Sequence, residues 1–193
     1  INCGSSSLKF ALYDTHASTQ AKQLNLLAEG IAEHVDTNTA NITIKLDSKK
    51  NKSPITLNKD TPAFHAESLA IILKQLDKDF NLDEKMLAVG HRVVHGGNIF
   101  SQSVVISDQV LQQIKNCVDL APLHNPANIV GIESLRAHFP KLPQIAVFDT
   151  AFHQTIPDFA STYALPKQWS QDYQIRRYGF HGTCHRYVIQ RTA

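Results

Sequence analysis

The chain has 193 residues, 42% of them apolar and 19% charged, a balance typical of a globular protein with a hydrophobic core. The formal net charge of +2 gives neither a basic surface nor an acidic tail, which argues against a nucleic-acid partner. No apolar run reaches the roughly 20 residues that a helix needs to cross a bilayer, so no membrane partner is expected either.

The first part of the chain is expected to form strands. A polar turn at residues 4–7 leads into the first of three predicted strands, which cover residues 8–13, 24–35 and 41–47. A loop rich in Lys, Asn and Ser follows at residues 48–53. Thr61 and Pro62 then supply an N-cap and a proline at the first helical position, and apolar residues spaced by three and four predict a helix over 62–80.

The rest of the chain alternates strands with helices. Residues 86–95 are rich in β-forming residues and end at two glycines, and residues 143–149 form an apolar run that ends in Asp149. A helix is predicted over residues 108–118. A second begins at the N-cap Asn125 and has Val130, Leu135 and Phe139 on its inner side. A third begins at about residue 183. This order predicts an α/β fold in which helices cover a sheet.

Both ends of the sequence resemble cut ends. Ile1 directly precedes a loop motif, and the last helical pattern stops at Ala193 without a glycine or proline. We therefore expect the chain to be a fragment of a longer protein. The three cysteines form no CxxC pair, which argues against disulfides and favours a reducing compartment, the cytoplasm.

The first chemical motif is the segment from Asn2 to Lys9, in which Gly4 and three serines form a turn between two strands. The glycine allows close backbone approach, and the hydroxyls of Ser5 and Ser7, the turn amides and the Lys9 ammonium are groups that bind phosphate. The pattern GxxxxGK[ST] is missing. The turn is either a phosphate-binding loop or simply a connection between strands.

The second motif runs from Gly90 to Gly97 and places Arg92 and Val94 on one face of a strand. A guanidinium fork beside a small apolar side chain suits a short-chain carboxylate, because the fork gives two charge-assisted hydrogen bonds and the valine excludes water from the alkyl group. The alternative is an arginine in a structural ion pair.

Three further motifs place polar residues at the ends of strands or helices. His124 lies just before the predicted N-cap at Asn125, where free amides stabilise anions. Asp149 ends a buried strand, at the edge of an α/β sheet where ligands bind. His181 lies between two glycines before a helix. Each residue also has a purely structural interpretation, as a loop contact or a helix cap.

The histidines suggest a rival class of site. A zinc hydrolase site could use histidines and a cysteine, here His91, His95, His124, His181, Cys184 and His185. The HxxxH spacing lacks the adjacent glutamate of HExxH, which argues against this class. A third possibility is a non-catalytic actin-like module that binds nucleotide as a switch.

In order and spacing, five segments resemble the acetate kinase family of acetate and propionate kinases, namely NxGSSSxK, GHRVVHGG, PLHNP, FDTAFH and RRYGFHGTxH. The resemblance covers nearly the whole chain and matches the N-terminal half of the family. It implies an actin-like ATPase (ribonuclease H-like) fold, with a first domain over residues 1–150 and the start of a second similar domain over 151–193. The implied reaction is the reversible phosphorylation of acetate by ATP with Mg²⁺, giving acetyl phosphate and ADP, with propionate as the alternative acceptor.

The resemblance also implies roles for single residues. Asn2 matches a magnesium-associated asparagine, and Lys9 with Ser5 and Ser7 lies on the nucleotide side. Arg92 resembles the carboxylate-binding arginine. An apolar pocket for the alkyl group is implied for Val94, Leu123 and Phe180, with His124 at a further active-site position.

Asp149 and His181 match the family's catalytic residues. His181 is expected to stabilise the transferring phosphoryl group. A carboxylic acid that titrates near pH 4–5 is already ionised at neutral pH and needs no proton acceptor, so we predict that Asp149 orients Arg92 or a magnesium-bound water.

Some family features are changed or missing. Cys184 replaces the usual serine of GTSH, and Cys3 replaces a common alanine. An HLGNG-like phosphate motif, a second active-site arginine and a metal-binding glutamate belong to the family's C-terminal half and have no counterpart here. The chain alone is therefore expected to catalyse little, and the full-length protein to form a homodimer.

Overall fold

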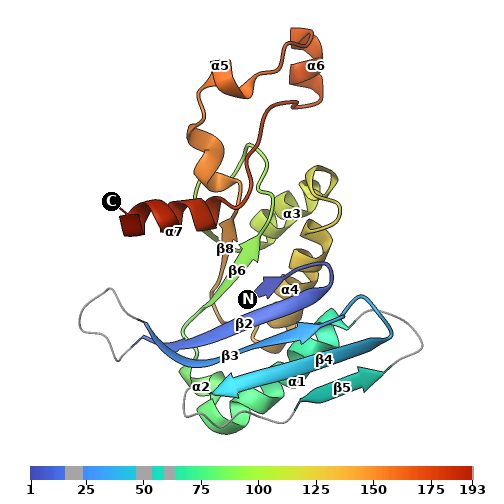
Figure 1. Ribbon diagram of the computed structural model, residues 1–193, viewed down its shortest axis with the longest axis vertical. Coiled ribbons are helices and arrows are strands. Elements are labelled where there is room, and N and C mark those ends of the chain that lie inside the picture. Colours follow the sequence, from blue (N-terminus) through green and yellow to red (C-terminus); the bar gives the residue numbers. More distant parts are fainter. Residues whose placement is uncertain (16–23, 47–53, 59–63, 193) are drawn as a thin grey trace.

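The computed structural model describes residues 1–15, 24–46, 54–58 and 64–192 and contains two sheets (Figure 1). The first sheet is antiparallel, with the strand order β1 (Asn2–Cys3), β2 (Ser7–Asp14), β3 (Asn25–Glu33), β4 (Thr39–Leu46) and β5 (Ile55–Asn58). The second has the order β6 (Val89–Val93), β8 (Gln144–Phe148) and β7 (Val104–Val105), with β6 and β8 parallel.

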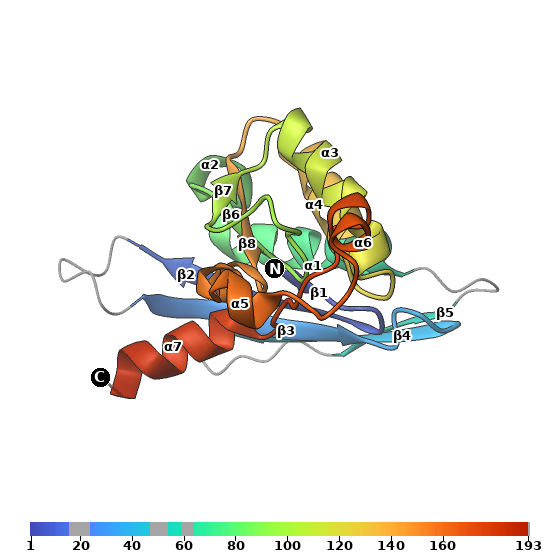
Figure 2. The ribbon, with the colours of Figure 1, turned by 90° about the horizontal axis from the view of Figure 1, so that it is seen from above.

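The two longest helices of the described residues have 16 and 14 residues. The α-helices are α1 (His65–Phe80), α2 (Leu82–Lys85), α3 (Asp108–Asn116), α4 (Asn125–His138), α5 (Asp158–Ser161), α6 (Lys167–Asp172) and α7 (Gly182–Thr192). The described residues also form two 3-10 helices, η1 (Val118–Leu120) between α3 and α4, and η2 (Ala151–Thr155) between β8 and α5. Figure 2 shows that α1, α3 and α4 lie on one side of the five-stranded sheet.

The backbone of Ile1 joins the two sheets. Its nitrogen donates a hydrogen bond to the carbonyl of Gly90 at 2.8 Å, and the N–H of Arg92 donates to the carbonyl of Ile1 at 3.0 Å. This is the bonding pattern of parallel strands. The turn that follows β1 and the carboxyl end of β6 are therefore held next to one another.

Two apolar clusters hold the layers together. The first lies between the five-stranded sheet and α1, where alternate residues of β2 and β4 meet the helix face of Leu69, Ile72 and Leu76. The second lies between the three-stranded sheet and α3 and α4, and includes Phe148 and Ile132. Full burial of such a side chain stabilises the fold by about 1.5–3 kcal/mol, so these clusters fix the strand ends that carry the polar motifs.

The predicted elements are largely confirmed, with several corrections. Helix α3 ends two residues early, and β6 covers only Val89–Val93 because the chain then leaves the sheet. Val130 is exposed and not on the inner side of α4, whereas Leu135 is buried and Phe139 packs against the first cluster. The predicted loop at 48–53 and the N-cap at 61–62 lie outside the described residues. The short strands β5 and β7 were not predicted.

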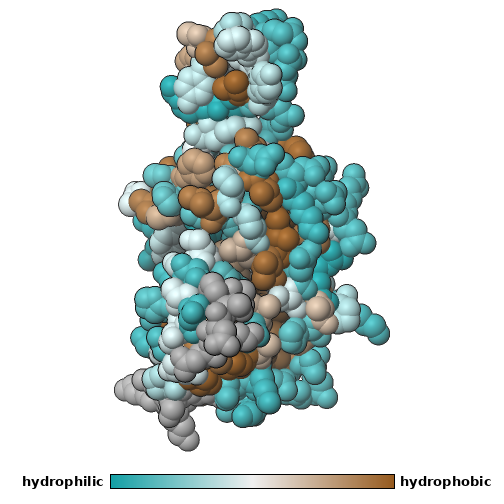
Figure 3. All heavy atoms as spheres, turned by 90° about the vertical axis from the view of Figure 1, so that its right-hand side faces the viewer, coloured by the Kyte–Doolittle hydropathy of each residue, from teal (hydrophilic) through white to brown (hydrophobic). Residues whose placement is uncertain are grey.

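The segment after Thr150 contributes little to either cluster. Of the described residues beyond this point, only Ser161 and Gly182 are buried. Residues 157–175 form an arm at the top of the molecule (Figure 1 and Figure 3). Its exposed large side chains are Phe159, Tyr163, Leu165, Trp169 and Tyr173. Within the described part of the chain, no helix is long and apolar enough to cross a membrane.

Candidate active site

The serine-rich turn is a tight connection between β1 and β2, as predicted. The N–H of Gly4 donates to the carbonyl of Ser7 at 2.7 Å, and the ring of His65 donates to the carbonyl of Gly4 at 2.8 Å. Ser5 is exposed and Ser7 is half-buried. The turn is therefore held through its carbonyl groups, while the Ser5 side chain remains open to a ligand.

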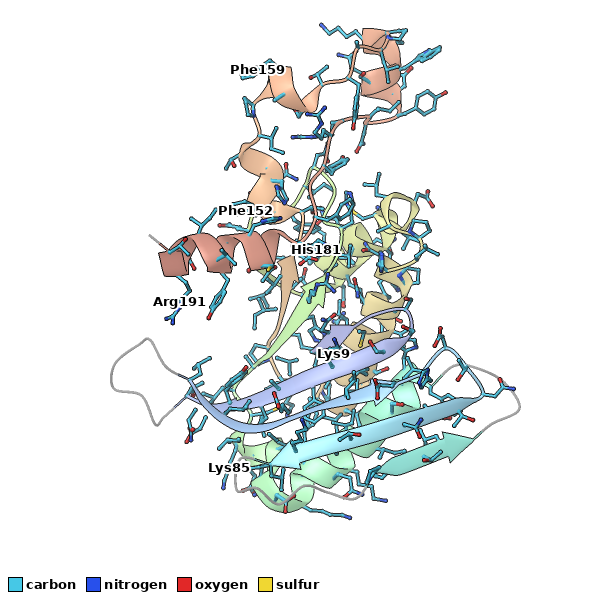
Figure 4. The ribbon with its side chains drawn as sticks, in the orientation of Figure 1. Lys9, Lys85, Phe152, Phe159, His181 and Arg191 are labelled. Carbon is cyan, nitrogen blue, oxygen red and sulfur yellow. The ribbon has the colours of Figure 1, made fainter. Side chains whose placement is uncertain are left out.

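Lys9 is the residue of β2 directly opposite Asn2 in the antiparallel register. Side chains at opposite positions of an antiparallel pair lie on the same face of the sheet. Lys9 is exposed, and Asn2 is half-buried against the second sheet. The predicted nucleotide-side Lys9 and metal-side Asn2 are thus cross-strand neighbours next to the turn, and Figure 4 marks the position of Lys9.

Arg92 joins three of the predicted motifs. Its Nε and one terminal nitrogen donate to Oδ2 of Asp149 at 3.0 and 2.5 Å, and its other terminal nitrogen donates to Oδ1 of Asn2 at 3.1 Å. Asp149 is buried, and Arg92 is half-buried. The ion pair that the sequence left open as an alternative is therefore present.

The ion pair does not use all of the guanidinium. An arginine has five N–H donors, and the three hydrogen bonds given above use three of them. The two terminal nitrogens each retain one N–H without a described protein partner. Guanidinium N–H groups bind carboxylates through charge-assisted hydrogen bonds, so Arg92 has donors left for a ligand while it holds Asp149.

Asp149 also holds the start of α7. Its Oδ1 accepts a hydrogen bond from the hydroxyl of Thr183 at 3.2 Å, and its backbone carbonyl accepts one from the N–H of Gly182 at 3.0 Å. A Cβ atom at position 182 would lie 2.2 Å from that carbonyl, so only glycine allows the approach. The parallel strands β6 and β8 thus deliver Arg92 and Asp149 to one sheet edge, where α7 begins.

His181 is exposed in the turn before α7. Its φ is 54°, in the left-handed region. This conformation costs roughly 1–2 kcal/mol for a residue with a side chain, and it persists only where the surroundings fix it. The neighbouring bonds from Gly182 and Thr183 to Asp149 are part of that support.

The three residues predicted to line an apolar pocket differ in burial, and their shared pocket stays a prediction. Val94 is buried. Phe180 is 46% exposed and meets the ring of His95 at 5.8 Å, next to Val94 in the chain. Leu123 is 75% exposed, and no described contact joins it to either residue.

His124 lies at the start of α4 and is exposed. The predicted N-cap at Asn125 is wrong, because Asn125 is the first helical residue and His124 precedes it without a side-chain cap bond. The amide of Asn125 instead accepts from the N–H of His95 at 3.0 Å and donates to the His95 carbonyl at 3.0 Å. A buried backbone that leaves its sheet needs such partners.

Sequence reasoning missed Asn128, whose buried side chain bonds two of the motif segments. Its Oδ1 accepts from the N–H of Val94 at 2.9 Å, and its Nδ2 donates to the carbonyl of Cys3 at 2.5 Å. One buried amide thus links the serine-rich turn to the predicted carboxylate pocket. Asn125 and Asn128 are three apart at the start of a helix, and this spacing puts both on one face.

The rival zinc site has no support in the described residues. They contain no group of three or more His, Cys, Asp or Glu side chains that could hold a metal. His91 is buried against Oε1 of Gln144 at 2.8 Å, and burial lowers its pKa to about 4. Burial also lowers the pKa of His95, whose Nδ1 accepts from the N–H of Gly97 at 2.9 Å. Both are neutral structural histidines.

Asn2 and Asp149 offer oxygen atoms of the kind that Mg²⁺ takes together with phosphate oxygens, and in this structure both accept hydrogen bonds from Arg92. Mg²⁺ is commonly held by one or two carboxylates, with waters and phosphate oxygens completing its shell. Asp149 is the carboxylate here, and Asn2 adds an amide oxygen.

A separate cavity of about 980 Å³ lies between β2, α1 and residues 82–90 and is lined by other side chains, such as Leu12, Leu76 and Met86.

Comparisons with known proteins point to one family. The family model described as the Acetokinase family matches residues 1–193. The chain is 47% identical over 197 residues to the acetate kinase of Thermoanaerobacter pseudethanolicus, which covers 100% of the chain and 47% of that relative. It is 47% identical over 188 residues to the acetate kinase of Dichelobacter nodosus, which covers 97% of the chain and 45% of that relative.

Solved structures agree in fold. A propionate kinase from Francisella tularensis matches with a TM-score of 0.82 and 43% identity, over 98% of this chain and 46% of that one. The acetate kinase of Porphyromonas gingivalis matches with a TM-score of 0.83 and 39% identity, and the match covers 99% of this chain and 46% of that one. The predicted actin-like α/β fold is confirmed, and the chain spans about half the length of the relatives it matches.

Proposed function

This chain belongs to the acetokinase family, and we propose that the protein containing it transfers a phosphoryl group reversibly between Mg-ATP and acetate, giving acetyl phosphate and ADP. The observation that carries this proposal is the position of Arg92. Its side chain contacts Asn2 beside the serine-rich turn and Asp149 beside the start of α7, and it keeps two N–H groups for a ligand. A carboxylate bound there lies between phosphate-binding groups and His181.

We assign the acceptor side to Arg92 and Val94. The two remaining N–H groups of Arg92 bind and orient the acetate carboxylate, and Val94 excludes water from the methyl group. One acetate oxygen attacks the γ-phosphorus, and the bond from that phosphorus to the bridging oxygen of ADP breaks. Acetate is already ionised at neutral pH, so no base is required, and Asp149 holds the guanidinium in place.

The donor side is assigned to the serine-rich turn and Lys9. Ser5, Ser7 and the turn amides bind phosphate oxygens, and the Lys9 ammonium offsets their charge. Asn2 and Asp149 are the residues that would hold Mg²⁺, which supplies charge neutralisation at the phosphates when bound. His181 donates a hydrogen bond to an equatorial oxygen of the transferring group as its charge redistributes.

Propionate is the second candidate acceptor. One structural relative is titled a propionate kinase. The predicted walls Leu123 and Phe180 are largely exposed, so the alkyl side of the pocket is open to a longer chain. His124 lies next to this opening in the chain and is proposed as a further contact to the substrate.

The domain boundary at residue 150 remains a proposal. It is supported by the small contribution of residues 151–192 to the core and by the exposed apolar side chains of the arm. We propose that residues 151–193 begin a second similar domain of the longer protein, which forms a homodimer.

The cysteines Cys3, Cys117 and Cys184 are all free, which suits the reducing cytoplasm.

The test is trapping of the acyl phosphate by hydroxylamine. The full protein that contains this chain is incubated with Mg-ATP and acetate, propionate or butyrate, and the hydroxamate is measured. Formation with acetate, and its loss without Mg²⁺, supports the proposal. Nucleotide binding without hydroxamate from any of the three acids would overturn it and favour a nucleotide-dependent switch, and stoichiometric zinc would favour a hydrolase.

A further inference from the structure

The turn at His181 is held by a residue that has no assigned role. Besides the contacts to Asp149, the turn is contacted by His153 of η2, whose Nε2 donates a hydrogen bond to the carbonyl of Phe180 at 2.9 Å. Phe180 directly precedes His181, so this bond fixes the peptide group that sets the φ angle of His181. Figure 4 shows Phe152, the neighbour of His153, beside the start of α7.

The ring of His153 also sets the path of the turn by packing. A Cβ atom at Gly179 would lie 2.4–2.6 Å from three atoms of this ring, so the backbone of the turn lies directly against it. The His153 ring also contacts two further rings in edge-to-face geometry. The centroid distances are 5.2 Å to Phe152 and 5.7 Å to His185. The ring is therefore fixed from several sides.

We infer that His153 is a positioning residue that holds the His181 turn in its left-handed conformation and so aims the His181 imidazole at the transferring phosphoryl group. The inference rests on the proposed function for its catalytic part. Asp149 and His153 lie four residues apart, at the end of β8 and in η2. The short segment 149–153 thus carries both Asp149, which bonds Arg92, and His153, which bonds the turn at His181. One segment therefore positions residues on both sides of the proposed reaction.

The experiment compares His153→Ala, His153→Gln and His153→Asn in the full protein. The glutamine amide nitrogen overlies the position of Nε2 and can donate to the Phe180 carbonyl, whereas the asparagine amide is too short. Loss of positioning by about 1 Å lowers kcat by up to roughly 100-fold. We expect His153→Ala and His153→Asn to lose about 10- to 100-fold in kcat with KM values for ATP and acetate within about twofold, and His153→Gln to recover most of the loss.

A second readout does not depend on activity. Hydrogen–deuterium exchange of the peptide covering residues 179–183 reports the Gly182 N–H bond to Asp149. We expect exchange to accelerate by about tenfold or more in His153→Ala, since local opening becomes easier. If the full protein forms no acyl phosphate, the proposed function fails, while the exchange result still decides whether His153 holds the turn.

Gly179→Ala tests the packing contact from the other side. The added methyl group collides with the His153 ring, and the φ of Gly179 lies outside the left-handed region, so the variant acts by contact alone. In the double variant with His153→Ala the collision is gone, and kcat should be no lower than in His153→Ala. Multiplicative losses would contradict a shared mechanism.

The matched control is His138→Ala. The Nδ1 of His138 donates to the carbonyl of Ser134 at 2.9 Å in the last turn of α4, the same kind and length of bond. This variant should keep the wild-type kcat and the exchange rate at 179–183. Unchanged kcat and exchange in His153→Ala, or equal effects of glutamine and asparagine, would overturn the inference. Faster exchange with unchanged kcat would overturn the catalytic link to His181.

Discussion

The ion pair between Arg92 and Asp149 has a counterpart elsewhere in the chain that is less buried and has one hydrogen bond fewer. Both Arg92–Asp149 and Arg136–Asp108 have a shortest N–O distance of 2.5 Å, and the arginine side chains are 33% and 34% exposed. The carboxylate is only 2% exposed in Asp149 but 94% exposed in Asp108. Asp149 accepts from two nitrogens of Arg92, whereas Asp108 accepts from one nitrogen of Arg136. Comparing the two pairs therefore measures burial together with the second hydrogen bond.

The expected coupling energies follow from this difference. Coupling energies of contacting residues lie at about 0.5–3 kcal/mol. The buried carboxylate puts Arg92–Asp149 toward the upper part of this range, and the one-third exposure of Arg92 lowers the expected value to about 2 kcal/mol. An exposed pair contributes about 0.5 kcal/mol. Double-mutant cycles with Arg92→Gln and Asp149→Asn, and with Arg136→Gln and Asp108→Asn, should thus give couplings of about 2 and 0.5 kcal/mol.

Each cycle is measured by urea unfolding of the full protein, with two spectroscopic probes that must coincide before a free energy is extracted. The same variants are assayed for kcat/KM with acetate, where a coupling of about 2 kcal/mol appears as a departure from multiplicativity of about 30-fold. The Arg136–Asp108 cycle should leave kcat/KM unchanged. Equal couplings at the two pairs would refute the idea that the buried Asp149 carboxylate orients Arg92.

Further predictions concern the pocket and the pH dependence. Arg92→Ala should raise KM for acetate at least about tenfold and leave KM for ATP nearly unchanged; steady-state kinetics with both substrates varied would expose a wrong assignment if only ATP suffered. Val94→Ala should shift kcat/KM toward propionate by about tenfold, from roughly 1–3 kcal/mol per methylene, and an unchanged preference would remove Val94 from the pocket wall. Burial lowers the pKa of His91 from 6.5 to about 4 in the folded state. Between these two pH values the His91 ring is therefore protonated in the unfolded state and neutral in the folded state. The free energy of unfolding should fall by up to about 3 kcal/mol as the pH drops from 6.5 to 4, and urea unfolding of His91→Gln should show a flatter pH dependence.

Much of the fold could be predicted because the local patterns agree with the tertiary structure. Alternate residues of β4 point to the same side of the sheet, and the apolar residues of α1 lie on one side of the helix. These two surfaces pack against each other in the first apolar cluster. The short strands β5 and β7 could not be predicted, since two to four residues carry no readable period. Their pairing depends on neighbours that are distant in the sequence.

The candidate site was predictable in its residues but not in its bonds. The sequence marks Arg92 and Asp149 as special, yet it gives no sign that Oδ2 of Asp149 accepts two of the arginine donors. Thr183 and His153 gave no signal of their own, because a hydroxyl and an imidazole near a helix start have many local uses. Their roles depend on the packing of α7 against η2, which no short-range pattern encodes.

The amide of Asn128 acts as a spacer of fixed length between the two halves of the proposed reaction. It ties the Cys3 carbonyl, on the donor side, to the Val94 N–H, on the acceptor side, through two hydrogen bonds from one rigid group. These two bonds fix the spacing between the backbone at Cys3 and the backbone at Val94. In the proposed reaction, side chains around the acceptor can then change without moving the two backbone segments apart.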